Sequence, residues 1–199
     1  MNNNARGFSG RLSVYKEVVS LAQKHKIRIA VETGTYKGDT ALALAEIFDE
    51  THTVELDESN YLHCVDRLRV SERIFCHHGN SPDWLNSFLP QYPQPIFFYL
   101  DAHWGDYWPI LDELRAIARC GHPGAVIAID DFQVPDRPNL GFDVYDDQPL
   151  NWNYVKDEVA KIYRPVKDFH HYYNDKVEGT GKGVVFIEPL GEKAFCNLC

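Results

Sequence analysis

The stretch that decides the fold is RIAVETGTYKGDTALALAEIFD, residues 28–49. It opens with a short apolar strand pattern at 28–32 and continues, after a turn, into an Ala/Leu-rich helix pattern at 38–49. Gly34 suits a tight turn, and Gly38 suits a close backbone approach where the helix begins. The free N–H groups at that point carry a partial positive charge. The stretch therefore predicts a strand–turn–helix unit with a ligand site at its turn.

The same alternation of strand and helix patterns continues along the chain. We expect strands at 28–32, 52–56, 73–76, 96–100, 125–129, 166–173 and 182–188. We expect helices at 11–26, 38–49, 58–69, 82–89, 107–119 and 151–162, with Ser81 as an N-cap. Apolar strands separated by helices indicate a parallel sheet covered on both faces. The short final link permits only antiparallel pairing. The fold class is therefore α/β, a doubly wound, mostly parallel seven-stranded sheet with a C-terminal antiparallel hairpin.

Length and charge limit the function. The 199 residues suit one domain, with a helix at 10–27, a core at 28–131, a loop at 132–149 and a helix with hairpin at 150–190. The net charge of −9 disfavours nucleic acid and anionic membranes as partners. We find no run approaching the roughly 20 apolar residues of a membrane span. The start of the chain also lacks the apolar region of a signal peptide.

The cysteines indicate a compartment. Five cysteines, an odd number, argue against a disulfide framework and for a reducing cytoplasm. Cys196 and Cys199 form a CxxC, but a zinc site needs four ligands and no second pair accompanies them. We therefore interpret this pair as an ordinary tail.

Polar residues follow several strands, at the sheet edge where open α/β folds bind ligands. Glu55 follows the glycine turn by about 20 residues, the placement of a carboxylate that accepts both hydroxyls of an adenosine ribose. It could also be a solvated acid at a strand end. Asn80 or Ser81 could bond an adenine edge, although helix capping explains Ser81 equally well.

Three aspartates follow two other strands. Asp101 ends the strand at 96–100, and Asp130 and Asp131 follow the strand at 125–129. If these carboxylates converge they repel, and a divalent cation such as Mg²⁺ would compensate them. The alternative is that they are separate caps or solvated strand ends. His103 could act as a general base, or could bond the backbone.

Read together, these residues resemble class I S-adenosylmethionine-dependent methyltransferases. The resemblance is to the metal-dependent O-methyltransferases of the catechol, caffeoyl-CoA and macrolide-sugar types, from about Ile29 to Phe132. VETGTYKGDTALALA looks like the first motif of that branch, E-x-G-x-x-x-G-x-[ST], and implies a Rossmann-like fold. The implied cofactor contacts come from Glu32, Gly34, Thr35, Tyr36, Gly38, Glu55, Asn80, Ser81 and Asp101.

YLDAHW and IDDF resemble the two metal motifs of the family. The resemblance implies that Asp101, Asp130 and Asp131 bind Mg²⁺. Relatives of the catechol type place a lysine base shortly after the first of these aspartates, whereas this chain has Gly105 and Asp106 in that region. Asp101 itself or His103 is then the candidate catalytic base.

The implied function is Mg²⁺-assisted methylation of a hydroxyl on a small molecule, a sugar or an arene, by S-adenosylmethionine. Trp104, Trp108 and the loop at 132–149 would form the acceptor wall, and the aromatic loop could be a homodimer contact. The alternative is a protein of the same fold that binds S-adenosylmethionine or a nucleotide but has no activity or a different one.

Overall fold

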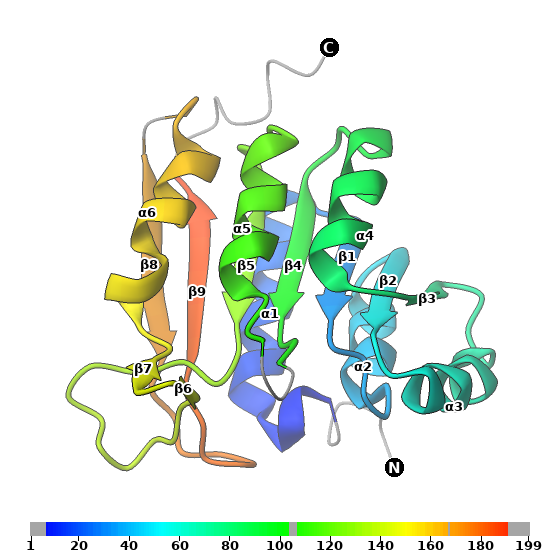
Figure 1. Cartoon of the computed structure of the whole chain (residues 1–199), viewed down its shortest axis with the longest axis horizontal. Helices are drawn as coiled ribbons and strands as arrows, with labels where there is room; N and C mark the ends of the chain where they lie inside the picture. Colours follow the sequence, from blue (N-terminus) through cyan, green and yellow to red (C-terminus); the bar gives the residue numbers. More distant parts are fainter. Residues whose placement is uncertain (1–6, 104–106, 167, 191–199) are drawn as a thin grey trace.

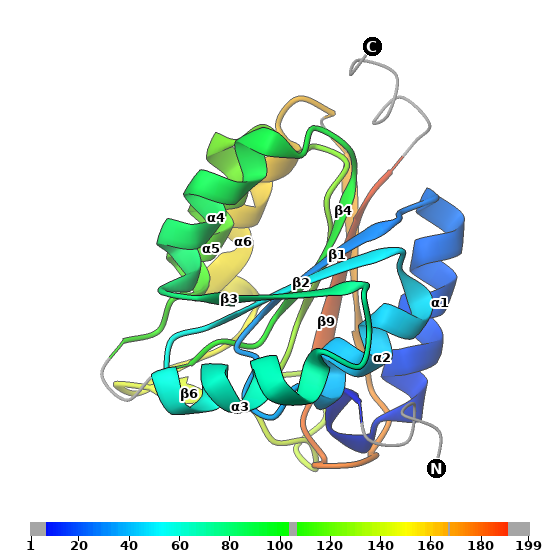
Figure 2. The ribbon, with the colours of Figure 1, turned by 90° about the vertical axis from the view of Figure 1, so that its right-hand side faces the viewer.

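A computed structural model describes residues 7–103, 107–166 and 168–190, and in it one sheet lies between two layers of helices (Figures 1 and 2). The strand order is β3-β2-β1-β4-β5-β9-β8. The strands are β1 Ile29–Thr33, β2 Glu50–Glu55, β3 Ile74–His78, β4 Ile96–Leu100, β5 Val126–Ile129, β8 Phe169–Asn174 and β9 Val184–Pro189. The helices are α1 Leu12–His25, α2 Asp39–Ile47, α3 Glu58–Leu68, α4 Ser81–Phe88, α5 Ile110–Arg119 and α6 Trp152–Tyr163.

The sheet is parallel except at one strand. β1 pairs in parallel with β2 and β4, and β4 pairs in parallel with β5. β9 is antiparallel to both of its neighbours, with Phe186 opposite Ala128 of β5 and Tyr172 of β8. The predicted fold class and final hairpin are therefore confirmed.

The hydrophobic core has one part on each face of the sheet, because successive strand side chains point to opposite faces. In β4, Phe98 belongs to the cluster under α4, α5 and α6, whereas Phe97 and Tyr99 belong to the cluster under α1 and α2. Figure 2 shows these helices as two layers flanking the sheet. Each fully buried side chain of this size contributes about 1.5–3 kcal/mol. The core thus fixes the strands whose carboxyl ends carry the site.

Two local expectations need correction. Asn80, not Ser81, is the N-cap of α4, and the Ser81 hydroxyl instead donates to Glu113 Oε1 at 2.5 Å. The expected irregular loop at 132–149 contains a small antiparallel pair, β6 Val144–Tyr145 and β7 Gln148–Pro149. None of the helices in the described ranges is long and apolar enough to cross a bilayer.

Candidate active site

A cavity of about 350 Å³ lies at the carboxyl edge of β1, β2, β4 and β5. This edge is where ligands bind in open α/β sheets. Among the residues that line it are these seven predicted ones: Gly34, Tyr36, Glu55, Asp101, His103, Asp130 and Asp131. The cavity therefore brings together side chains from both halves of the predicted site.

The glycine turn brings two loops into contact. Gly34 has φ +81°, and a Cβ there would lie 2.8 Å from the carbonyl oxygen of Asp101. Gly38 has φ +75° at the N-cap of α2, where a Cβ would meet Leu68 at 3.0 Å. Both glycines are needed for positive φ and close approach, and Gly34 sets the distance between the β1 and β4 ends of the cavity.

Glu55 is buried at the end of β2 and holds the turn. Its Oε2 accepts from the backbone N–H of Tyr36 at 2.8 Å, and its Oε1 accepts from the N–H of Asp57 at 2.9 Å. A carboxylate oxygen can accept more than one hydrogen bond. The carboxylate therefore has capacity left for hydroxyl donors in the cavity that it lines.

Five predicted cofactor residues do not line this cavity: Glu32, Thr35, Gly38, Asn80 and Ser81. Glu32 is buried and accepts from the Thr53 hydroxyl at 2.6 Å, and burial raises the pKa of its carboxyl to about 8. The Thr35 hydroxyl lies 2.6 Å from that of Thr53. The Oδ1 of Asn80 is buried without a hydrogen-bond partner in the described part of the chain. A direct cofactor contact by these residues stays a prediction.

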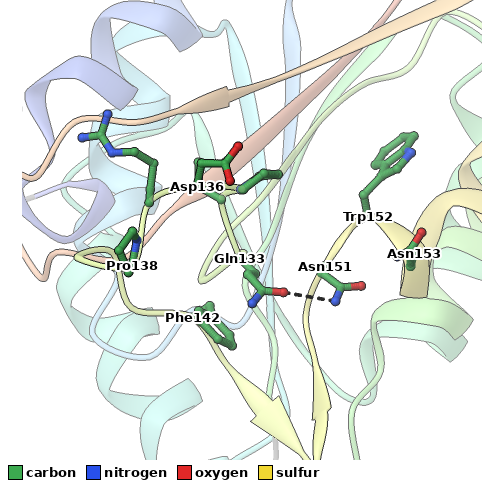
Figure 3. A pocket seen from close by; sticks show the side chains of 10 residues that line it. Gln133, Asp136, Pro138, Phe142, Asn151, Trp152 and Asn153 are labelled. Carbon is green, nitrogen blue, oxygen red and sulfur yellow. Dashed lines mark hydrogen bonds between the residues drawn. The ribbon is translucent and has the colours of Figure 1, made fainter.

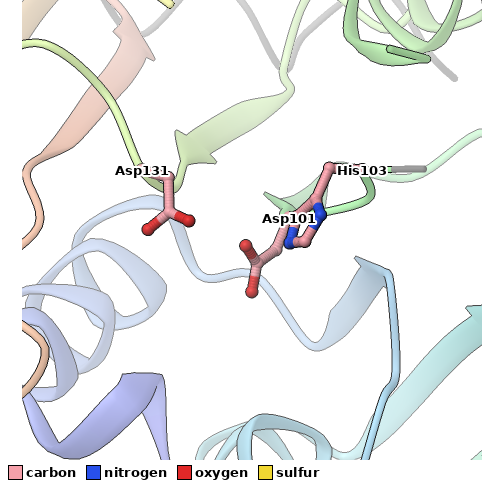
Figure 4. Close-up of side chains that lie close together, drawn as sticks. All are labelled: Asp101, His103 and Asp131. Atoms are coloured by element: carbon pink, nitrogen blue, oxygen red, sulfur yellow. The ribbon is translucent and has the colours of Figure 1, made fainter. Parts of the chain in front are cut away.

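Three groups converge at the other end of the cavity (Figure 4). Asp101, His103 and Asp131 each offer one ligand atom, and these atoms lie within 4.8 Å of one another. Burial, and then the charges of Asp130 and Asp131, raise the pKa of Asp101 well above its usual range. Burial and Asp130 also raise the pKa of Asp131 to about 6, against the opposing effect of Lys182. Both carboxyls therefore hold a proton more tightly than an ordinary aspartate does.

Asp130 is paired with a buried cation. Its Oδ1 and Oδ2 accept from the guanidinium of Arg11 at 2.6 and 2.5 Å, and Oδ2 also accepts from the Tyr99 hydroxyl at 2.5 Å. Arg11 and Asp130 are both buried. A metal role for Asp130 stays a prediction, and in this structure both of its oxygens contact the Arg11 guanidinium.

Asp131 is paired as well. The ammonium of Lys182 donates to Asp131 Oδ2 and, at 2.8 Å, to Asp143 Oδ1. A metal bound here would have three protein ligands: Asp101, His103 and Asp131. The Asp131 carboxylate would then be shared between the metal and the ammonium of Lys182. Mg²⁺ prefers oxygen ligands, and an imidazole suits transition metals better. The donors as arranged do not fit Mg²⁺.

A second cavity, of about 460 Å³, lies between the loop that follows Asp131 and the start of α6 (Figure 3). Phe142, Pro138 and Trp152 line it, and the amide of Asn151 donates to Gln133 Oε1 at 3.1 Å. One face of the Trp152 ring is stacked on the His171 ring, with the ring centroids 3.6 Å apart. This cavity shows that the loop carries a surface of mixed aromatic and amide character.

Of the two tryptophans expected to contact the acceptor, Trp108 already stacks on other aromatic rings. Trp108 stacks on both Tyr145 and Tyr154, each with ring centroids 5.1 Å apart. Its ring is thus engaged by two other aromatic rings and serves to hold the loop to α6. Trp104 lies outside the described residues.

Sequence reasoning missed the cations and several polar residues of the site. Lys182 and Thr180 lie in the glycine-rich segment GTGKG at 179–183, where the sequence predicts only the end of a polar turn and the start of the strand at 182–188. Arg11 carries no local signal, since it stands 119 residues before Asp130. Ser9 and Asn60 also line the first cavity, and no motif marks either of them.

Known structures give the nearest comparison. No family model matches the chain, and no curated protein sequence matches it. The structure resembles the O-methyltransferase TomG of Streptomyces achromogenes, solved in complex with SAM, with a TM-score of 0.63 and 20% identity over 91% of this chain and 81% of that one. An O-methyltransferase of Bacillus cereus in complex with SAH has a TM-score of 0.63 and 18% identity, covering 90% and 81% of the two chains.

The likeness extends to another activity. Precorrin-8w decarboxylase of Methanobacterium thermoautotrophicum has a TM-score of 0.53 and 15% identity, covering 89% of each chain. Likeness at this level of identity identifies architecture, because one fold can host several reactions. The chain has the Rossmann-like methyltransferase fold.

Proposed function

We propose that this protein is an S-adenosylmethionine-dependent O-methyltransferase that methylates a hydroxyl of a small molecule, a sugar or an arene. The observation that carries this proposal is one cavity with Glu55 at one end and Asp101 with His103 at the other. A hydroxyl-binding carboxylate and a proton acceptor are the two groups that such a reaction needs from the protein. Two structural relatives that were solved with SAM or SAH support the cofactor.

The cofactor end is built from the β1 and β2 loops. S-adenosylmethionine, when bound, supplies a methyl group on a positively charged sulfur. Glu55 would accept hydrogen bonds from the ribose hydroxyls. Because Gly34 has no side chain, the loops that follow β1 and β4 can lie close together beside the cavity. The backbone bonds of Glu55 to Tyr36 and Asp57 fix that carboxylate before any ligand arrives, which lowers the ordering cost of binding.

At the acceptor end the protein orients a hydroxyl and removes its proton. The hydroxyl oxygen would accept the methyl group that the bound cofactor supplies, and the neutral thioether would be the leaving group. The hydroxyl proton passes to the carboxylate of Asp101 or the imidazole of His103, and then to water. The raised pKa of Asp101 makes it a stronger base than an ordinary aspartate. Most of the rate enhancement would come from positioning.

Other parts of the sequence-based hypothesis stay predictions. Magnesium assistance is one of them: Asp101, His103 and Asp131 converge, but Lys182 and Arg11 hold two of the three predicted carboxylates. We therefore assign no step to a metal. A cytoplasmic location, a homodimer contact and the absence of nucleic-acid and membrane partners are likewise predictions from composition.

Calorimetric titration with S-adenosylmethionine tests the cofactor assignment. We expect saturable binding by the wild type and a loss of roughly 10- to 100-fold in affinity for Glu55→Ala, as for hydrogen bonds to a charged group. Glu58→Ala is the matched control, because it removes an exposed acid of equal charge three residues away. Absence of binding by the wild type, or equal affinity of Glu55→Ala and wild type, would reject the assignment.

The competing hypothesis is a protein of this fold without methyl transfer, because one fold can host several reactions, and one structural relative is named a decarboxylase. Incubation with methyl-labelled cofactor and mixtures of sugars and phenols separates the two. Label recovered as a methyl ether supports the proposal. Tight cofactor binding with no labelled product from any hydroxyl compound would favour the alternative.

A further inference from the structure

The acidic cluster has cations of its own. Asp130 is paired with Arg11, and Asp131 and Asp143 share the ammonium of Lys182. Asp101 has no ion pair within the described ranges of the chain. Carboxylates that converge must be neutralised by a cation or by protons, and here the chain supplies positive charge to three of the four aspartates. The convergence of these carboxylates therefore does not by itself require a metal.

Lys182 is held firmly by its backbone. Gly141 donates to the Gly181 carbonyl at 2.8 Å, and Gly183 donates to the Gly141 carbonyl at 3.1 Å, so the residues on both sides of Lys182 are bonded to the loop. The Lys182 carbonyl also accepts from Arg11 Nη1 at 3.2 Å. A fixed backbone places the ammonium in the same position each time the protein folds.

The side chain of Lys182 reaches the candidate active site. It is 34% exposed and lines the same cavity as Asp101 and His103. Asp131, its partner, is one of the three groups that would bind a metal. An ammonium and a divalent cation on the same carboxylate repel each other strongly at such separations. Lys182 and a metal are therefore alternatives at this site.

We propose that Lys182 is the resident cation of this active site and takes the place of a divalent metal beside the acceptor oxygen. The inference rests on the proposed methyl transfer. A fixed positive charge next to the acceptor hydroxyl stabilises the negative charge that develops on oxygen as its proton leaves. The proton goes to Asp101 or His103, and Lys182 keeps all of its own protons throughout.

The test uses Mn²⁺ alone as the probe, because it does not require the acceptor to be known. Binding is measured by electron paramagnetic resonance on wild type, Lys182→Met and Lys182→Arg. Lys182→Met should bind Mn²⁺ roughly 10- to 1,000-fold more tightly than wild type, the effect of removing a like charge at about 4–6 Å. Lys182→Arg keeps the charge and should behave as wild type does. Adding Asp131→Asn to Lys182→Met should abolish the gain and so locate the ion.

Two results would overturn the inference: wild type that binds Mn²⁺ as tightly as Lys182→Met, or Lys182→Arg that gains binding as Lys182→Met does. Thermal melts show whether each variant is folded. If Lys182→Met is not folded, Lys182→Gln takes its place in the Mn²⁺ comparison. Titration of wild type with S-adenosylhomocysteine is run in parallel. Failure of that titration rejects the proposed function, whereas the Mn²⁺ comparison decides the role of Lys182 separately.

Discussion

The two halves of the carboxyl edge hold their acids by different means. At the β1–β2 end, Glu55 is held by backbone N–H groups and Glu32 by the Thr53 hydroxyl, with partners 2 to 21 residues away. At the β4–β5 end, Asp130 and Asp131 are held by cations 119 and 51 residues away. The donors at the first end are neutral and come from β2 and the turns beside it, whereas the two cations come from segments 171 residues apart in the sequence. The first half is therefore a local structure and the second is assembled from distant parts.

The largest expected effect comes from breaking the distant pairing. Arg11→Met leaves a buried Asp130 carboxylate without its cation, and removing one partner of a buried pair typically costs about 3–5 kcal/mol. We expect the free energy of unfolding, measured with urea, to fall by that amount. The double variant Arg11→Met with Asp130→Asn removes the orphan charge and should recover part of the loss. If the single variant is as stable as wild type, the pair is not a structural requirement.

The second prediction concerns pH at the local end. The pKa of Glu32, raised from 4.5 to about 8, means that the folded protein holds this proton more tightly than the unfolded chain. The stability that the folded protein gains from holding this proton is fully present below about pH 4.5. It is lost as the pH rises through about 8. Glu32→Gln mimics the protonated acid, so it should match wild type near pH 5 and exceed it by roughly 2–4 kcal/mol near pH 9.

Urea melts of both proteins across this range check that prediction, and exposed Glu58→Gln is the control. The difference between wild type and Glu32→Gln removes the pH dependence of every other group. A constant difference across the range would mean that Glu32 is ionised in the folded protein. The neutral-donor description of the β1–β2 end would then be wrong.

A smaller effect tests the contact between the two halves. Gly34→Ala places a Cβ 2.8 Å from the Asp101 carbonyl oxygen at φ +81°, whereas Gly121→Ala at φ +68° meets no atom within 4 Å. Both variants incur the left-handed backbone cost of about 1–2 kcal/mol. Any additional loss of stability in Gly34→Ala therefore measures the close approach of Gly34 to the Asp101 carbonyl oxygen. We expect thermal melts to show the larger loss for Gly34→Ala. Equal losses would mean that the two loops can move apart freely.

The fold could be predicted almost completely from the sequence because its signals are local. Strand and helix periodicities are set by neighbouring residues, and the seven strands and the final hairpin are confirmed with ends shifted by only a few residues. The glycine turn was predictable for the same reason, since φ +81° at Gly34 depends on its own backbone. Ser81 was misread because its partner, Glu113, is 32 residues away on α5.

The acid cluster was only half predictable. Adjacency suggested that Asp130 and Asp131 act together, but Asp131 has φ +52° just after β5, and the two side chains meet different cations. No pattern within the IDDF segment indicates the positive φ of Asp131 or the ion pair between Asp130 and Arg11. Residue type predicted a charged site, and only the tertiary structure determined which charges remain free.

The position of β9 has a consequence for biosynthesis. It is the last strand of the described residues, yet it lies between β5 and β8 rather than at an edge, and Lys182 stands two residues before it. During translation, β5 keeps an unpaired edge and Asp131 lacks its ammonium until this segment leaves the ribosome. Because unpaired strand edges invite association with other chains, the β5 edge is open to such association until β9 has been made. Completion of the sheet and of the site's charge balance then occur together.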